Sequence, residues 1–152
     1  MKYFDQLVQD MIEDVDASAT DCVTLKLTLP AKILMANSGQ NKHWAKKAAE
    51  IKRVKRDTAL ICMAAMSGVT YPCPWQRAVA LETYVWTSNA VRDERNATTS
   101  TKAIWDGIVD SGLLIDDDTK HLRHIPPIFK VDKTDPHLLI QIWNVTLMKG
   151  SE

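Results

Sequence analysis

Acidic side chains gather between residues 92 and 118, before, within and after a short predicted helix. A compact helix with acids on its surface and at both ends can fold those acids toward one point. Converging carboxylates repel one another unless a cation lies between them. Hard divalent ions that prefer oxygen ligands, Mg²⁺ or Mn²⁺, suit such a site. The acids are Asp93, Glu94, Asp106, Asp110, Asp116, Asp117 and Asp118.

A simpler interpretation fits the same stretch. Charged residues around a surface helix are usually solvated, and a run of aspartates after a helix that ends at glycine is often a turn. On these residues alone, the metal site and the solvated turn remain open as alternatives.

The helix within this stretch is predicted from apolar residues at helical spacing. One of the hydroxyl residues at 98–100 can cap its start, and Gly112 can end it. Lys102, Asp106 and Asp110 follow one another at four-residue intervals, so they share one helix face. The apolar positions are Ala103, Ile104, Ile108 and Val109.

A second, longer helix is predicted over residues 41–66, with cations along the face opposite its apolar stripe. Glu50 is the only acid between Asn41 and Arg56, whereas a solvated face normally mixes both signs. A line of cations can follow DNA phosphates, although a solvated helix face is the simpler alternative. The cations are Lys42, Lys46, Lys47, Arg53 and Arg56, and the apolar stripe is Ile51, Val54, Thr58, Ile61 and Ala65.

Four strands are predicted, at residues 23–29, 77–87, 122–131 and 138–147. The third is broken by Pro126-Pro127, which places it at an edge or a bulge. The last is apolar on both faces, so it is either buried on both sides or lies at a subunit contact. Together these elements predict an α+β fold, with a small mixed sheet of about four strands packed against two main helices.

An extra acidic amphipathic helix is predicted at residues 2–17, so that residues 1–20 form an addition to a core at 21–152. The helix either packs on the core as a surface helix, or its acidic face covers a basic DNA surface until DNA displaces it.

Length and composition limit the class of protein. With 152 residues, 45% hydrophobic and 25% charged, the chain resembles an ordinary globular protein of one main domain. Its formal net charge is zero, so overall basicity gives no sign of nucleic acid. We found no apolar run of membrane-spanning length and no signal-peptide pattern, so a cytoplasmic protein without a membrane partner is expected.

Cysteine and histidine spacing does not indicate a zinc site. The three cysteines lack ligand spacing and are expected to be reduced thiols. His121, His124 and His137 also lack that spacing and are predicted to be ordinary surface residues. There is no glycine-rich phosphate loop, so a small-molecule cofactor is not expected.

The stretch 92–118 resembles the core motif of the RusA-type Holliday junction resolvases. That motif contains an R-D-x-D-N cluster, a nearby lysine, an aspartate four residues later, and a D-D pair that follows a glycine. The resemblance extends over residues 23–147. The matching residues are Arg92, Asp93 and Asn96 for the cluster, Lys102 and Asp106 for the lysine and helix aspartate, and Asp116 and Asp117 for the pair.

Two departures from the family pattern stand out. Arg95 replaces the second aspartate of the cluster, and a few extra residues separate Asn96 from Lys102. A cation is unfavourable in a metal site unless it faces a phosphate. We therefore expect Arg92 and Arg95 to contact DNA, and Glu94 to stand in as a metal ligand.

The resemblance implies a nuclease domain at residues 21–152, acting in a bacterial or phage-infected cell. A homodimer would place two sites on a four-way junction and cut it by paired symmetric nicks. Asp93, Asp116 and Asp117 would bind Mg²⁺, or alternatively Mn²⁺, and Lys102 would stabilise charge on the phosphate. Asn96 and Asp106 would support them. The alternatives are a degenerate relative that binds branched DNA without cutting it, and an unrelated α+β domain with solvated acids.

Overall fold

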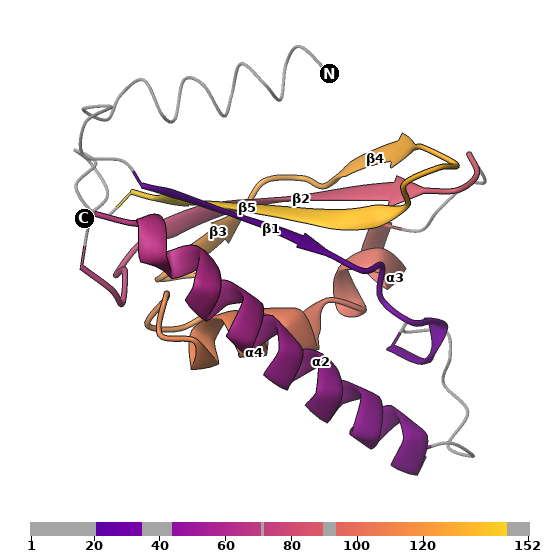
Figure 1. Ribbon diagram of the computed structural model, residues 1–152, viewed down its shortest axis with the longest axis horizontal. Helices are drawn as coiled ribbons and strands as arrows, with labels where there is room; N and C mark the ends of the chain where they lie inside the picture. The colour runs from indigo at the N-terminus through magenta and orange to yellow at the C-terminus, as the bar shows by residue number, and fades with distance from the viewer. Residues whose placement is uncertain (1–20, 35–43, 71, 90–93, 146–152) are drawn as a thin grey trace.

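The computed structural model describes residues 21–34, 44–70, 72–89 and 94–145. These residues form a mixed five-stranded sheet, and two main helices pack on one face of it (Figure 1). The predicted α+β class, mixed sheet and two main helices are therefore confirmed. The predicted helix at 2–17 lies outside the described residues.

Strand β2 (Ala78–Trp86) is the centre of the sheet. Its first neighbour, β5 (His137–Asn144), pairs with it in the antiparallel sense and also pairs antiparallel with β1 (Cys22–Leu27). Along its other edge β2 pairs in parallel with β3 (Leu122–His124) and then with β4 (Ile128–Val131). The central position explains why β2 is rich in Val, Leu, Tyr and Trp and is buried along nearly its whole length.

The edge strand is split in two at Pro126-Pro127, which is why the sheet has five strands rather than about four. Ala80 is opposite His124 but Thr83 is opposite Ile128, so the edge carries one extra residue between these pairs. Proline has no N–H to donate to the ladder, and a bulge accommodates the extra residue. The predicted edge or bulge is confirmed.

Helix α2 (Trp44–Ala65) crosses the sheet and continues into a 3-10 turn, η4 (Met66–Gly68), while a shorter 3-10 turn, η1 (Lys32–Leu34), follows β1. The second main helix is α4 (Lys102–Asp110), preceded by a short helix that was not predicted, α3 (Glu94–Thr99). Gly112, at φ 89°, follows the end of α4 as expected.

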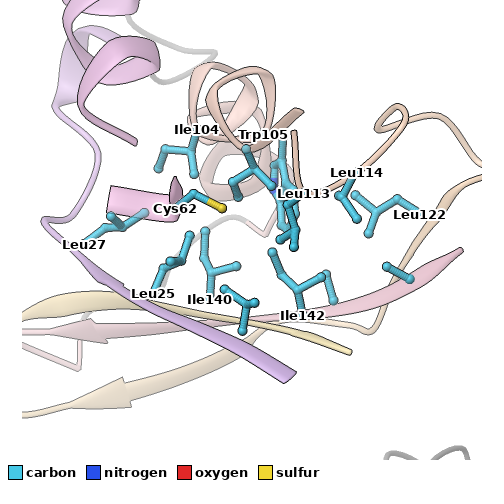
Figure 2. Close-up of a cluster of buried hydrophobic side chains, with 14 of the residues drawn as sticks. Leu25, Leu27, Cys62, Ile104, Trp105, Leu113, Leu114, Leu122, Ile140 and Ile142 are labelled. Carbon is cyan, nitrogen blue, oxygen red and sulfur yellow. The ribbon is translucent and has the colours of Figure 1, made fainter. Parts of the chain in front are cut away.

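The core lies between the sheet and the two helices (Figure 2). Strand β5 shows the half-buried alternation of a strand with one face on a core, because Leu138, Ile140 and Ile142 are buried and their neighbours are half-buried. From the helix side of the same core, α4 contributes buried apolar residues that include Ile104 and Ile108. Each such side chain contributes roughly 1.5–3 kcal/mol by leaving water.

The two helices approach each other most closely at Gly107. A Cβ atom at this position would lie 2.5 Å from the carbonyl oxygen of Lys55 and 3.0 Å from Cβ of Thr58. Only glycine leaves room for the α2 backbone here, so Gly107 fixes the distance between α2 and the helix that carries Lys102.

The predicted apolar stripe of α2 is only partly correct. Thr58 is buried and Val54 and Ala65 are half-buried, but Ile51 and Ile61 are 37% and 43% exposed. The stripe that packs on the core turns through Cys62 instead of Ile61. Ile51 and Ile61 therefore lie away from the face of α2 that packs on the core.

A smaller apolar cluster lies on the second face of the sheet, and Trp143 of β5 packs against it. Strand β5 thus contributes apolar side chains to both faces, in keeping with its apolar sequence. None of the described helices combines the length and apolarity that crossing a bilayer requires. The buried members of this cluster are Val79, Leu81, Ile125 and Val145.

Candidate functional site

Lys102 lies between two carboxylates. Its Nζ is 2.8 Å from Oδ2 of Asp117 and 3.0 Å from Oδ1 of Asp106. Asp106 lies one turn further along α4, and Asp117 belongs to the loop after that helix. The predicted shared helix face is confirmed for Lys102 and Asp106, and the structure adds the ion pair between them. Asp110, one turn beyond, pairs with Lys55 of α2 at 3.4 Å.

The two members of the tighter pair each favour the charged form of the other. The hydrogen bond from Lys102 lowers the pKa of Asp117 below its ordinary value, against the opposing effect of partial burial. The hydrogen bonds to Asp117 and then Asp106 raise the pKa of Lys102. The site therefore presents a lysine ammonium and a carboxylate, both ionised at neutral pH.

The three consecutive aspartates have separate roles. Only Asp117 reaches Lys102, while Asp116 is exposed and its Oδ1 accepts the N–H of Asp117 at 2.7 Å. Asp118 closes the next turn, where its Oδ1 accepts the N–H groups of Lys120 and His121 and lies 2.7 Å from Nδ1 of His121. That pairing with His121 lowers the pKa of Asp118. The solvated-turn interpretation thus fits Asp118, and not Asp117.

The RusA-type cluster is placed only in part. Asn96 is half-buried in α3, and its carbonyl accepts the N–H of Ser100 at 3.3 Å. Glu94 and Arg95 form the first positions of the same helix. Arg92, Asp93 and Lys42 lie outside the described residues, so the convergence of Asp93 on Asp117 stays a prediction.

A cavity of about 680 Å³ opens beside Lys102 and Asp117. Its walls come from α3, from the start of α4 and from the proline break in the edge strand. Glu82 and Trp105, both buried, line it, and so does His124 of β3. The volume falls within the roughly 300–1,000 Å³ typical of small-ligand sites.

Glu82 is a site residue that the sequence analysis missed. It is only 4% exposed, and its Oε1 accepts the indole N–H of Trp105 at 2.6 Å. The hydroxyl of Tyr84 donates to its Oε2, and that of Thr101 lies 3.2 Å from Oε1. Burial is the main cause that raises the pKa of Tyr84, and the nearby charge of Glu82 is the second. A signal existed in the sequence, because Glu82 is the only charged residue of an otherwise apolar strand.

The same network corrects the predicted start of α4. The N-cap residue is Thr101 rather than one of residues 98–100, and its side chain makes no cap hydrogen bond. The Thr101 hydroxyl faces Glu82 and the carbonyl of Thr98 instead. Glu82 thereby connects the central strand β2 to Thr101, which precedes Lys102, and to Trp105 on the same helix.

His124 was also missed as a site residue. It is exposed, as predicted, but its ring meets the Trp105 ring edge-on, with centroids 4.8 Å apart and planes at 87°. Partial removal of its ring from water lowers the pKa of His124, although the negative charges of Glu82 and Asp117 act in the opposite direction. His124 is therefore largely neutral at pH 7 and can both donate and accept a hydrogen bond.

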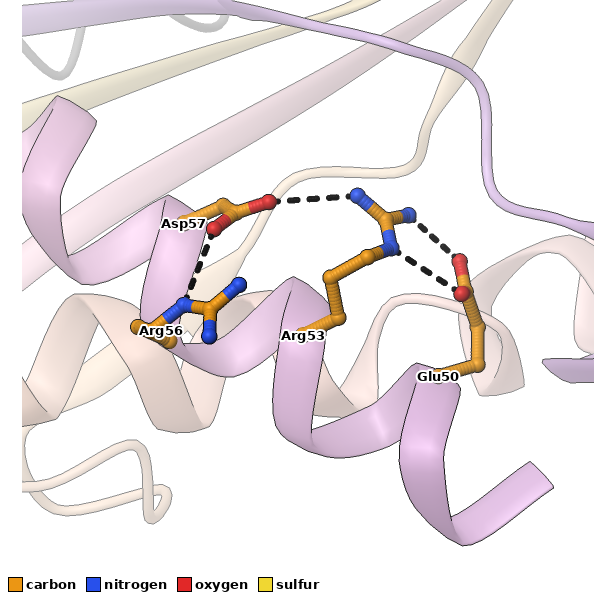
Figure 3. A network of polar contacts seen from close by, with 4 residues as sticks. All are labelled: Glu50, Arg53, Arg56 and Asp57. Carbon is orange, nitrogen blue, oxygen red and sulfur yellow. Dashed lines mark hydrogen bonds and ion pairs between the residues drawn. The ribbon is translucent and has the colours of Figure 1, made fainter. Parts of the chain in front are cut away.

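The predicted cationic stripe on α2 is partly neutralised. Arg53 bonds to both Glu50 and Asp57, and Arg56 bonds to Asp57 at 3.3 Å (Figure 3). The prediction weighed Glu50 but overlooked Asp57, the residue immediately after the stripe. Lys46 is exposed and Lys47 half-buried, and neither has an ion-pair partner among the residues that the structure describes.

Two residues near Lys102 supply the kind of oxygen donor that a hard divalent ion prefers. Asp116 and Asp117 are adjacent oxygen donors, and a carboxylate that accepts from Lys102 keeps lone pairs for a metal. We found no group of three or more His, Cys, Asp or Glu side chains arranged for a metal ion within residues 21–34, 44–70, 72–89 and 94–145. The remaining predicted ligands are Asp93, outside these ranges, and Glu94, at their boundary.

In comparisons with known proteins, no family model and no curated protein matched the chain. The similarity to the RusA-type resolvases therefore rests on the motif residues given above.

Proposed function

We propose that this protein is a Mg²⁺-dependent endonuclease that resolves Holliday junctions or related branched DNA by paired symmetric nicks. It would act in recombination, repair or replication in a bacterial or phage-infected cytoplasm. The observation that supports the proposal best is the position of Lys102, within 3.0 Å of both Asp106 and Asp117 beside an open cavity. These three residues match the lysine, the helix aspartate and one of the paired aspartates of the RusA-type motif.

The chain's own residues have distinct tasks in this proposal. Asp93, Asp116 and Asp117 hold the metal with help from Glu94, and Mn²⁺ can replace Mg²⁺. When bound, the metal supplies an activated water and neutralises charge on the phosphate. Lys102, kept protonated by its carboxylate partners, donates to a phosphate oxygen as negative charge builds there.

Asp106 and Asn96 are supporting residues. Asp106 lies one turn from Lys102 and limits the directions in which the long lysine side chain can point. Asn96, in α3, would orient a metal ligand or a water.

DNA would be held mainly through its backbone and its branched shape. Lys42, Lys46, Lys47, Arg92 and Arg95 would meet phosphates directly. Arg53 and Arg56 can join them only by loosening their bonds to Glu50 and Asp57. A homodimer would present two such sites to the two-fold symmetric junction.

The second candidate is a relative that binds branched DNA without cutting it. Arg95 favours it, because a cation replaces one aspartate of the family's acidic cluster.

A synthetic four-way junction, incubated with and without Mg²⁺, tests the proposal. We expect paired nicks that need Mg²⁺ and that Asp117→Asn abolishes. The matched control is Asp57→Asn, an aspartate that also pairs with a cation but does not line the cavity beside Lys102. It should nick normally.

Other outcomes select the alternatives. A gel shift without nicks supports the DNA-binding relative. The absence of both nicks and a shift supports the unrelated domain, and equal nicking by Asp117→Asn would contradict the proposed catalytic site.

A further inference from the structure

The cavity beside Lys102 contains a feature that phosphate hydrolysis does not require. Glu82, which lines it, is the one buried charged residue in the described part of the chain. A phosphate would be repelled by a carboxylate, so this end of the cavity is not built for the DNA backbone. It is suited to a ligand that brings N–H donors.

We propose that the cavity receives a single unstacked nucleobase bearing an exocyclic amino group, next to the phosphate that Lys102 contacts. This rests on the proposed function, because DNA must lie at Lys102 for its base to reach the cavity. Cytosine, adenine and guanine have such an amino group, and thymine does not.

Glu82 retains acceptor capacity for this base. A carboxylate offers about four acceptor positions. The Trp105 indole and the Tyr84 hydroxyl occupy one each. The single proton of the Thr101 hydroxyl has two acceptors in reach, and the Thr98 carbonyl at 2.8 Å is closer than Glu82 at 3.2 Å. At least one position therefore remains for an amino group from the ligand.

The walls suit a flat ring. Pro126 and Pro127 line the cavity at the bulge in the edge strand, where they add rigid apolar surface without N–H groups. His124 faces the same space and has an aromatic ring held against Trp105. Aromatic and histidine side chains are common stacking partners for unstacked bases.

The neighbouring charges suit the rest of the nucleotide. Lys102 and Asp117 line the same cavity as Glu82, so one nucleotide can place its phosphate at the ammonium and its base at the carboxylate. Extrusion of a base is least costly where pairing is already disturbed, as at a branch point.

The first test changes the DNA, so that the protein cannot misfold. Junctions with 2-aminopurine at each branch-point nucleotide are mixed with the full chain without divalent metal, and fluorescence is read at saturation. We expect one nucleotide to brighten as it leaves the stack. Replacing that base with thymine should weaken binding about tenfold, the loss of one hydrogen bond to a charged group.

The second test changes the protein. His124→Ala should remove most of the fluorescence change while the chain stays folded, as checked by its melting temperature. The matched control is His121→Ala, a histidine of the same segment that pairs with Asp118 rather than lining the cavity. Glu82→Gln keeps the side-chain shape and should reduce the penalty for thymine.

The outcomes separate this inference from the proposed function. A junction that binds, but shows no brightened nucleotide and the same affinity with thymine, overturns the base site and leaves the nuclease proposal standing. A protein that binds no junction at all overturns both.

Discussion

The molecule contains two similar ion clusters with different settings. In each, one cation lies between two carboxylates: Arg53 between Glu50 and Asp57, and Lys102 between Asp106 and Asp117. The first is made entirely by neighbours along α2 (Figure 3). The second joins a helix to a loop that lies 15 residues away in sequence.

The difference shows that the same arrangement of charges can have different roles, depending on the residues and cavities around it. Side-chain exposure does not separate the clusters, because Glu50 is 22% exposed and Asp117 21%. Arg53 borders a smaller cavity of about 270 Å³ with mostly apolar walls, whereas Lys102 borders the larger cavity that contains buried Glu82. We therefore interpret the Lys102 cluster, beside the larger cavity, as the catalytic candidate, and the Arg53 cluster as an ion network internal to α2.

The largest contrast between the clusters is expected when each loses its cation. Lys102→Met should slow Mg²⁺-dependent junction nicking by about 10²–10³-fold, since it removes a donor to developing charge on the phosphate. Arg53→Met should slow it less than about tenfold, because Arg53 contributes at most one backbone contact. Single-turnover cleavage rates check both, and comparable losses would erase the distinction.

A smaller effect is expected where the helices bearing the two clusters meet. Gly107→Ala should lower the free energy of unfolding by about 1–3 kcal/mol, because its Cβ would press on the Lys55 carbonyl 2.5 Å away. Gly68→Ala is the control, with no heavy atom within 4 Å of its added Cβ. Urea denaturation measures both. Equal stability of Gly107→Ala and wild type would mean that α2 and α4 are not tightly packed.

The smallest effect is a pH dependence of the Lys102 cluster. Because the folded-state pKa of Asp117 is lowered, its stabilisation is present above the ordinary aspartate pKa of about 3.9 and is lost as pH falls through the lowered value. The loss should be at most about 1 kcal/mol. Denaturation of Asp117→Asn should show a correspondingly shallower decline in acid. A decline identical to wild type would indicate that the Lys102–Asp117 bond is not formed in solution.

Much of the fold could be predicted because its signals are local. Alternating apolar residues identified the strands, Pro126-Pro127 identified the interrupted edge, and Gly112 identified the end of α4. The spacing of Lys102 and Asp106 also predicted that they share one helix face, since residues four apart on a helix are neighbours.

Other features depend on contacts between distant segments. Glu82 gains its partners from α4, which no pattern within β2 reveals, although a lone charge in a buried strand marked the position. The exposure of Ile51 depends on which face of α2 packs on the core. The division of labour between Asp117 and Asp118 depends on a turn that directs them apart.

The most direct test of the central claim is a Mn²⁺ titration of the metal-free chain, followed by the loss of the free-ion signal in electron paramagnetic resonance. Wild type and Asp57→Asn should take up Mn²⁺ with the same saturable affinity, and Asp117→Asn should lose that uptake. If Asp117→Asn binds Mn²⁺ as tightly as wild type, the carboxylates beside Lys102 do not form the metal site of a nuclease.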